Sequence, residues 1–153
     1  MPKKNPDIRK EAIDSFVSRA DIYSAYESKP RTYGSDELLY AREVHAISAI
    51  GRHNGVDMGT LAKELGVTGG AATRTVNKLV RKGYVSRKQS SSDSRKYICR
   101  LTDKAKEIFA YHEALDSKTY RELSEKLSVF SDDEIKAAIR LLNIMAETIK
   151  EWK

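Results

Sequence analysis

The sequence of 153 residues contains a single cysteine, Cys99, so an intramolecular disulfide is excluded. No CxxC spacing occurs either, and we do not expect a cysteine-based metal site. The sequence has no run of about 18 apolar residues, the length that a transmembrane helix needs. The N-terminal stretch MPKKNPDIRKEAI lacks an apolar core of signal-peptide length. We therefore expect a cytoplasmic protein without a membrane span.

Signatures of common enzyme classes are also missing. We find no phosphate-binding loop, no nucleophile elbow and no pair of carboxylates in a catalytic context. Internal repeats and low-complexity segments are absent as well. We predict that the protein is not an enzyme and needs no cofactor. The length suits one domain with a real core, and 40% hydrophobic with 33% charged residues suits a soluble, helix-rich protein.

Positive charge is concentrated in one part of the chain. The formal net charge is +6 and the pI is about 9.3. Nine of the 28 lysine and arginine residues lie between Thr68 and Arg100, but only one of the 22 acidic residues, Asp93, lies there. A solvated charged face usually mixes the two signs. The block therefore favours a polyanionic partner such as DNA.

Apolar residues at helical spacing, with capping residues before them, predict six helices. The first is expected at about residues 8–27, and the second from a cap at Ser35 to about residue 50. The third spans "MGTLAKEL" after a cap at Asp57, and the fourth spans "GGAATRTVNKLVRK" after a cap at Thr68. The fifth begins at residues 102–103, and the last follows a capping box at residues 131–134. Gly83 is expected just past the end of the fourth helix.

The periodicity changes to that of strands after Gly83. "YVSRK" and "RKYICRL" are predicted strands, and "QSSSDS" is the polar turn between them. The predicted fold class is mainly α, an α+β winged helix with dimerisation helices at both ends. We divide the chain into an N-terminal helix (1–35), a winged helix-turn-helix (36–102, wing 84–101) and C-terminal helices (103–153).

A helix, a tight glycine turn and a second helix with a basic outer face form a helix-turn-helix. The second helix would lie in the major groove, where Arg74 can contact base acceptors bidentately. Asn77 can contact a base or help to position the helix. Small residues in its first turn would permit close approach and could receive a phosphate. An ordinary helical hairpin is the alternative. The basic β-hairpin that follows favours a winged helix instead.

The stretch from residue 61 to residue 108, "LAKELGVTGGAATRTVNKLVRKGYVSRKQSSSDSRKYICRLTDKAKEI", resembles the winged-helix core of the MarR family of bacterial transcription regulators. The likeness is carried by LAxxLxV, by VxxLxxxGYVxR and by DxRxxxxxLTxxA. Ala105 stands where the family usually has glycine, and it suits a helix interior better. The resemblance implies a homodimer that binds a pseudopalindromic operator, often as a repressor released by a small molecule or a metal.

In the family, the arginine of the wing enters the minor groove and the aspartate supports it. The resemblance gives these roles to Arg95 and Asp93, and a turn-capping role for Asp93 is compatible with that. The predicted DNA-binding residues are Thr68, Gly69, Gly70, Thr73, Arg74, Asn77, Lys78, Arg81, Arg87, Lys88, Ser92, Asp93 and Arg95.

The terminal helices carry apolar stripes that a winged helix need not bury. They either pack within one chain or form a dimer, and we favour the dimer because it would space two recognition helices by about one turn of DNA. The predicted interface residues are Ile13, Phe16, Val17, Ile139, Leu142, Met145 and Trp152.

The effector is less defined by the sequence. A small molecule between the dimer helices and the winged domains could contact Tyr23, Tyr26, Tyr40, Arg42 and Tyr111, with Arg19 as an alternative cation for an anionic ligand. The alternative, which we prefer, is that these tyrosines are amphipathic residues at the boundary between the core and solvent. No metal site is predicted, and the weaker candidates are His45, His112 and Glu27, with Glu43, Glu113 and Asp116 as further ligands.

Two alternatives remain for other features. Cys99 could be a redox sensor, but its place in a predicted strand favours a small buried side chain. A winged helix can also bind RNA or protein without sensing a ligand. The charge block argues against a purely protein partner, and the wing offers only Tyr97 as the exposed aromatic that RNA readers use.

Overall fold

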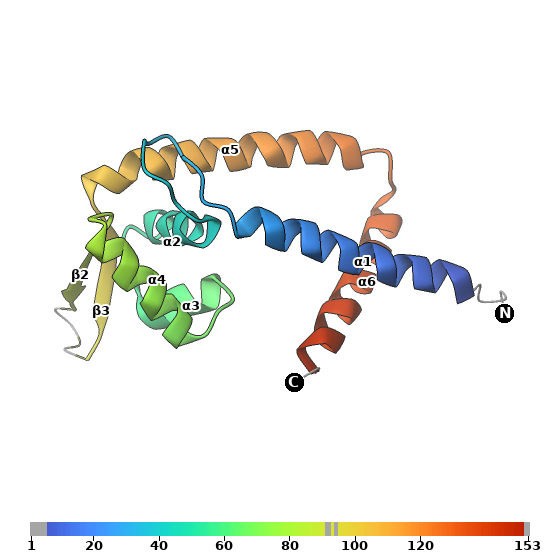
Figure 1. Cartoon of the computed structure of the whole chain (residues 1–153), viewed down its shortest axis with the longest axis horizontal. Coiled ribbons are helices and arrows are strands. Elements are labelled where there is room, and N and C mark those ends of the chain that lie inside the picture. The colour runs from blue at the N-terminus through green and yellow to red at the C-terminus, as the bar shows by residue number, and fades with distance from the viewer. Residues whose placement is uncertain (1–5, 91–92, 94, 152–153) are drawn as a thin grey trace. The chain divides into compact units, whose positions relative to one another are not determined.

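The computed structural model of the chain describes residues 6–90, 93 and 95–151, and these ranges contain six helices and three short strands (Figure 1). The helices are α1 (Pro6–Glu27), α2 (Ala41–Arg52), α3 (Met58–Glu64), α4 (Gly69–Arg81), α5 (Asp103–Leu127) and α6 (Asp132–Glu151). The strands are β1 (Val56–Asp57), β2 (Val85–Gln89) and β3 (Tyr97–Leu101). The predicted fold class, a mainly helical winged helix, is confirmed.

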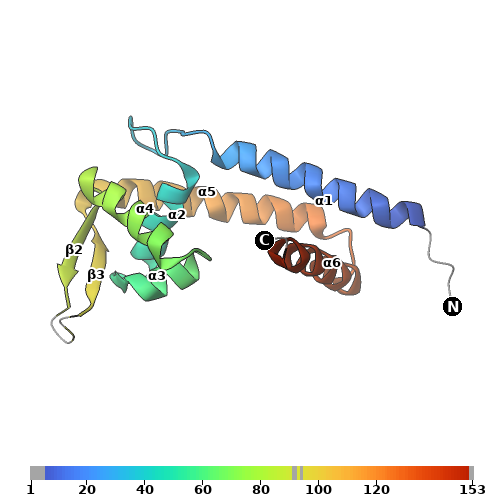
Figure 2. The ribbon, with the colours of Figure 1, turned by 60° about the horizontal axis from the view of Figure 1, so that its bottom comes forward.

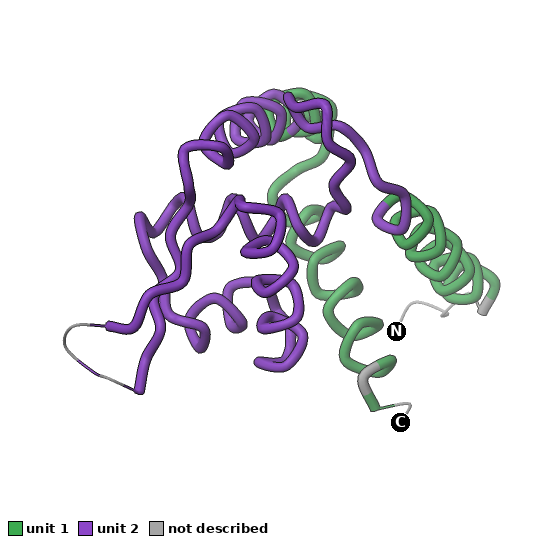
Figure 3. Tube along the Cα trace, turned by 60° about the vertical axis from the view of Figure 1, so that its left-hand side comes forward, with its two compact units in different colours: residues 1–26, 120–153 green, residues 27–119 purple. Residues whose placement is uncertain are grey.

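The chain separates into two compact units (Figure 3). Unit 1 comprises residues 1–26 and 120–153, and unit 2 comprises residues 27–119. Helix α5 contributes to both units. The three-part division proposed from the sequence, with boundaries at residues 35 and 102, stays a prediction. Among the described residues, none of the helices combines the length and the apolar character that crossing a membrane requires.

The core lies in unit 2 and is built from α2, α3, α4, the sheet and the first half of α5. Its buried side chains include Leu39, Val44, Ile47, Ile50, Leu61, Val76, Leu79, Tyr84, Val85, Cys99 and Ile108. Helix α2 continues through Gly51, where the sequence had suggested that it ends. A Cβ atom on Gly51 would lie 2.5 Å from a ring carbon of Phe109, so glycine permits α5 to approach α2 here.

The sheet has the order β1-β3-β2, and both pairings are antiparallel. Cys99 is paired with Val56 on one side and with Arg87 on the other, so β3 is the central strand. The sequence did not predict β1, because two residues are too few to show a strand periodicity. This third strand pairs with β3 and so extends the hairpin of β2 and β3. Figure 2 shows that hairpin beside α3 and α4.

Several predicted caps are confirmed by hydrogen bonds. Asp57 accepts from the amides of Gly59 and Thr60 at 2.8 and 3.0 Å, and Thr68 Oγ1 accepts from the Ala71 amide at 3.3 Å. Gly83 has a φ of 77°, as a glycine after the last helical turn requires. The predicted capping box at residues 131–134 also forms: the Glu134 carboxylate accepts from the Ser131 amide, and the Ser131 hydroxyl accepts from the Glu134 amide. These local signals can be identified from the sequence because each involves residues within one turn.

The predicted cap at Ser35 is wrong. Helix α2 begins at Ala41, and the capping residue is Tyr40, whose amide donates to Glu43 Oε2 at 2.8 Å. Ser35 lies instead among bends that are closed by an isolated antiparallel bridge, in which Arg31 and Leu39 exchange two backbone hydrogen bonds of 2.9 Å. Long-range contacts thus override the local preference of serine and the two acids after it for a helix start.

Candidate nucleic-acid interface

Helix α4 presents a polar face with an open first turn. Its apolar side, formed by Ala72, Val76 and Leu79, is buried. No atom lies within 4 Å of a Cβ built on Gly69 or Gly70, so the start of the helix is accessible to a large partner. Six of the predicted contact residues in this region are exposed: Thr68, Gly69, Gly70, Arg74, Asn77 and Arg81. Thr73 is half-buried. The exposed set forms a surface on which a nucleic acid can meet main-chain amides and basic side chains.

The ammonium group of Lys78 does not extend freely from this face. Lys78 Nζ lies 3.2 Å from Glu43 Oε1 and 4.7 Å from the centre of the Tyr40 ring. Lys82, one turn further along, reaches the same carboxylate oxygen at 2.9 Å. The predicted contact residue Lys78 is therefore held by α2, while Arg74 and Arg81 are exposed.

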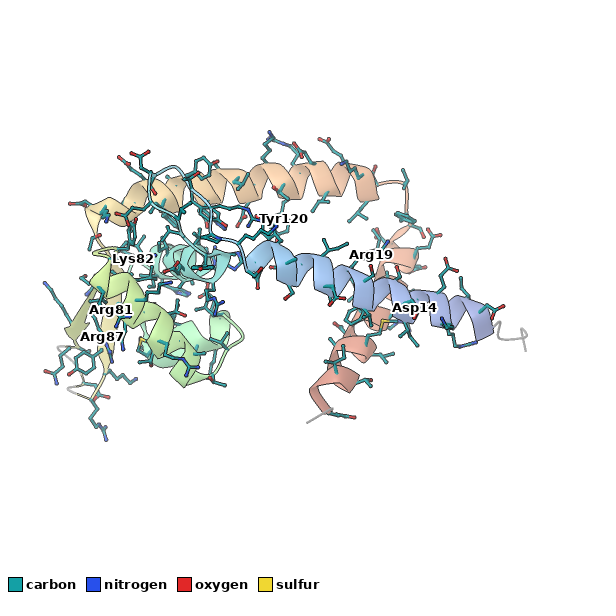
Figure 4. The ribbon with its side chains drawn as sticks, viewed as in Figure 1. Asp14, Arg19, Arg81, Lys82, Arg87 and Tyr120 are labelled. Carbon is teal, nitrogen blue, oxygen red and sulfur yellow. The ribbon has the colours of Figure 1, made fainter. Side chains whose placement is uncertain are left out.

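The wing consists of β2, β3 and the turn between them. Arg87 and Lys88 are exposed neighbours on β2, and the guanidinium of Arg87 lies 4.6 Å from the centre of the Tyr97 ring. Figure 4 shows Arg87 on the wing, and Arg81 and Lys82 at the end of α4 from which β2 starts. The basic side chains of α4 and of the wing thus belong to one contiguous segment of unit 2.

At the tip of the wing, Asp93 and Arg95 are brought together. Asp93 Oδ1 accepts from the Arg95 amide at 3.0 Å and lies 3.4 Å from Arg95 Nε. The Arg95 side chain is 90% exposed. The aspartate therefore organises the turn and restrains the arginine at once, while the end of the guanidinium points to solvent. Ser92, also predicted here, lies outside the described residues.

A polar network fixes the base of the wing. Thr102 Oγ1 donates to the Gly83 carbonyl at 2.7 Å, and the Thr102 amide donates to the Tyr84 carbonyl at 3.0 Å. The hydroxyl of buried Tyr84 donates to Glu37 at 2.8 Å, and burial together with this bond raises the pKa of Tyr84 to about 12. Lys104 Nζ lies 2.6 Å from Glu37 Oε1. The sequence did not reveal Glu37 and Tyr84 as partners, because 47 residues separate them.

A second cluster in unit 2 contains the predicted metal candidates. His112 Nδ1 lies 3.1 Å from Ser48 Oγ and 3.2 Å from Asp116 Oδ2. The ring of His45 lies 5.5 Å from that of His112, and His45 Nδ1 is 3.9 Å from Glu27 Oε1. A cavity of about 230 Å³ is lined by His45, Ser48, Arg52, Glu64, Leu65, His112 and Asp116.

The chemistry of this cluster suits a borderline metal ion. Burial, opposed by the charge of Asp116, lowers the pKa of His112, so the ring is neutral and able to coordinate. Two imidazoles and two carboxylates match the nitrogen and oxygen ligands of zinc. The carboxylate of Glu113, another predicted ligand, lies within 4.8 Å of the ligand atoms of His112 and Asp116, and it also accepts from Arg52 at 2.9 Å. Glu43 is held by two lysines.

The tyrosines predicted to contact an effector do not share one place. Tyr40 and Arg42 line a cavity of about 620 Å³ with His45, Arg74 and Lys78. Tyr111 packs against Gly34 and is not among the residues that line this cavity. Tyr23 and Tyr26 belong to unit 1, where their rings are stacked 6.4 Å apart, and so does Arg19, whose guanidinium donates to the Ser15 carbonyl at 3.2 Å.

The predicted dimerisation residues that the structure describes all lie in unit 1. An apolar groove of about 520 Å³ between α1 and α6 is lined by, among others, Ile13, Phe16, Val17 and Met145. Ile139 and Leu142 are exposed outside this groove, with about half of each side chain accessible. Trp152 lies outside the described residues.

The redox alternative for Cys99 receives no support from its environment. Its side chain is fully buried, with Sγ at 3.6 Å from Met58 Sδ. Burial raises the pKa of the thiol, which disfavours the reactive thiolate.

Comparisons with known proteins agree with this geometry. Residues 39–96 match the MarR family. The transcriptional regulator PchR of Bacillus subtilis (strain 168) is 25% identical over 107 residues, which cover 70% of this chain and 63% of PchR, less than two thirds of its length.

Two solved structures share the fold over most of their length. Streptococcus pneumoniae FabT, in complex with DNA, has a TM-score of 0.64 and 25% identity, covering 97% of this chain and 100% of that one. Lactococcus lactis ZitR, a zinc-responsive MarR family member, has a TM-score of 0.69 and 20% identity, covering 92% and 98%.

Proposed function

We propose that the chain is a winged-helix transcription regulator of the MarR family that binds double-stranded DNA as a homodimer and represses transcription. The relatives found are regulators and not enzymes, in agreement with the prediction from the sequence. The observation that carries the proposal is the exposed basic face of α4 with its open first turn, together with the wing that follows it.

We assign the DNA contacts to side chains of α4 and the wing that can reach a bound duplex. Helix α4 lies in the major groove, and its first turn approaches a phosphate through Thr68, Gly69 and Gly70. Thr73, Arg74, Asn77 and Arg81 contact bases or backbone along the groove. In the wing, Arg87 and Lys88 contact phosphates and Arg95 enters the minor groove. FabT, whose structure contains DNA, shares the fold over 97% of this chain.

The operator is a pseudopalindrome on this proposal. One winged helix offers few phosphate contacts, whereas two copies related by a twofold axis place two recognition helices on one face of the duplex. The exposed apolar side chains of α1 and α6 supply the surface that joins the copies.

A direct comparison of ligands tests DNA binding against the alternative of an RNA-binding or protein-binding module. Fluorescence anisotropy at physiological salt is measured with labelled duplex DNA and with single-stranded and hairpin RNA of the same sequence. We expect tighter binding to duplex DNA and a steep salt dependence. Equal or tighter binding to RNA, or no binding to any of them, contradicts the proposal.

The effector is a second part of the proposal. The specific observation that favours a metal is the convergence of His45, His112 and Asp116 on one cavity, with Glu27 beside His45. ZitR, which shares the fold, is zinc-responsive. We therefore propose a divalent metal at this cluster. The small-molecule alternative, an anion beside Tyr40 and Arg42, stays open because their cavity also reaches α4.

Zinc titration calorimetry of the purified protein separates these possibilities. We expect about one zinc ion per chain and loss of that binding in His112→Ala. His53→Ala is the matched control, since His53 is not among the residues that line the cavity, although its partner Glu64 is. No zinc binding by the wild type, or equal binding by His112→Ala, contradicts the metal site and leaves the small molecule as the effector.

A further inference from the structure

A buried carboxylate connects α2 to the recognition helix. Glu43 is 1% exposed although it is charged, and it lies beneath α4. Carboxylates are rarely buried unless their charge is matched. Here three donors match it: the Tyr40 amide at 2.8 Å, Lys82 Nζ at 2.9 Å and Lys78 Nζ at 3.2 Å.

The two lysines are one helical turn apart, so both project from the same side of α4. Their common attachment to a single oxygen restricts rotation of α4 about its axis. A further bond runs from Lys82 Nζ to the Leu38 carbonyl at 3.5 Å. Toward the first turn of α4, by contrast, a Cβ built on Gly69 or Gly70 would meet no other part of the fold within 4 Å. The helix is therefore anchored at its C-terminal half and open at its N-terminal end.

The same contacts keep the ammonium group of Lys78 from binding a DNA phosphate. Its ammonium is bound to Glu43 and also lies over the Tyr40 ring. Moving it to a phosphate would leave the buried carboxylate with one lysine instead of two, which is costly. Burial, the largest influence, raises the pKa of Glu43, but the bonds from Tyr40, Lys82 and Lys78 outweigh it and lower that pKa, so the group is ionised at neutral pH.

We propose that Glu43 is a positioning residue for DNA recognition: it fixes the orientation of α4 and withholds the charge of Lys78 from the DNA backbone. This inference rests on the proposed DNA binding. Lysine–phosphate contacts add affinity for any sequence, so withholding one favours discrimination over non-specific binding. Arg81, exposed on the same helix, keeps its charge available.

The salt dependence of duplex binding tests the proposal, because its slope counts the phosphates that the protein neutralises. Wild type, Lys78→Ala and Arg81→Ala are titrated with one duplex over a range of salt concentrations. We expect Arg81→Ala to flatten the slope of log K against log salt by about one unit and Lys78→Ala to leave it unchanged. Equal flattening by both variants would overturn the inference.

Glu43→Gln provides the complementary result. Glutamine has the same shape and can still accept the bond from the Tyr40 amide, but it carries no charge to hold Lys78. We expect a slope steeper by about one unit and a smaller ratio of operator to non-operator affinity. In the double variant with Lys78→Ala the slope returns to the wild-type value.

Asp103→Asn is the matched control, because Asp103 also pairs with a lysine, but with Lys106 of α5 and not with α4. It should leave the slope unchanged. A purely structural role of Glu43 predicts lower affinity with no change in slope, and that outcome would also overturn the inference. If the wild type does not bind duplex DNA at all, the proposed function itself fails; if it binds and the slopes disagree, only the role of Glu43 fails.

Discussion

The two units differ in where their apolar side chains lie. Unit 2 buries its hydrophobic residues in one core, which includes Leu39, Ile47 and Leu79. In unit 1 no described residue is buried, and Ile13, Val17, Ile139, Leu142 and Ile144 are each about half exposed or more. Contacts within the chain thus account for unit 2, whereas unit 1 leaves its apolar side chains exposed. On the proposed function, a second copy of the chain covers them, as a pseudopalindromic operator would require.

The largest effect is expected from charging the exposed face of unit 1. Leu142→Glu places a carboxylate in the proposed dimer interface, where its desolvation is costly. We expect a dimer-to-monomer change in sedimentation equilibrium. Operator affinity should fall by about 100-fold or more, because the two half-sites no longer bind together.

Arg140→Gln, at an exposed polar position of the same helix, should have neither effect. A wild-type chain that is already monomeric at micromolar concentration, or a dimeric Leu142→Glu variant, would contradict the proposal that a second copy covers the apolar surface of unit 1.

A smaller effect is expected at the wing. Arg95 has no role in the core, since its side chain is 90% exposed and forms an ion pair with Asp93, two residues away. Arg95→Ala should therefore leave the melting temperature unchanged and weaken operator binding by about tenfold, as for the loss of one groove contact. Anisotropy titration with the operator measures this. Unchanged affinity would exclude Arg95 from the interface.

The flanking basic residues of the wing should act mainly through charge. Removing Arg87 or Lys88, each exposed on β2, should flatten the salt slope by about one unit per variant if each contacts one phosphate. Lys106→Ala is a suitable control, because this exposed lysine is paired with Asp103 at 2.7 Å on α5. Slopes that do not differ between the wing variants and this control would place the wing away from the DNA.

The smallest effect concerns the stability of unit 2 in acid. The pKa of Glu43 is lowered in the folded state, so its ionised form stabilises the fold above the unfolded value of 4.5. That contribution is lost as the pH falls through the lower, folded-state pKa. We expect the melting temperatures of wild type and Glu43→Gln to converge as the pH falls below 4.5. A difference in melting temperature that is independent of pH would show that the carboxylate charge is not stabilising.

The sequence predicted the features of unit 2 that depend on neighbouring residues. Thr68 caps α4 and Gly83 follows its end because these signals lie within one turn of the chain. The Asp93–Arg95 contact, between residues two positions apart, was expected from the resemblance to the MarR family.

Features formed across the fold were not predictable. Strand β1 exists because Val56 pairs with Cys99, and α2 starts at Ala41 because Tyr40 and Glu43 cap it while Glu37 is bound to Tyr84. The attachment of Lys78 to Glu43 joins residues 35 positions apart in different helices, and no local pattern indicates it. Periodicity placed Lys78 on the outer face correctly, but a long side chain can turn back to a buried charge.

Selection from a library of random duplexes, followed by sequencing of the bound fraction, tests the central claim most directly. A homodimer with α4 in the major groove should enrich an inverted repeat whose half-sites are about one helical turn apart, 10–10.5 base pairs. Enrichment of that repeat by the wild type, and its loss in Leu142→Glu, is the predicted result. No enriched sequence, or a single unrepeated site bound equally by both proteins, would contradict the account.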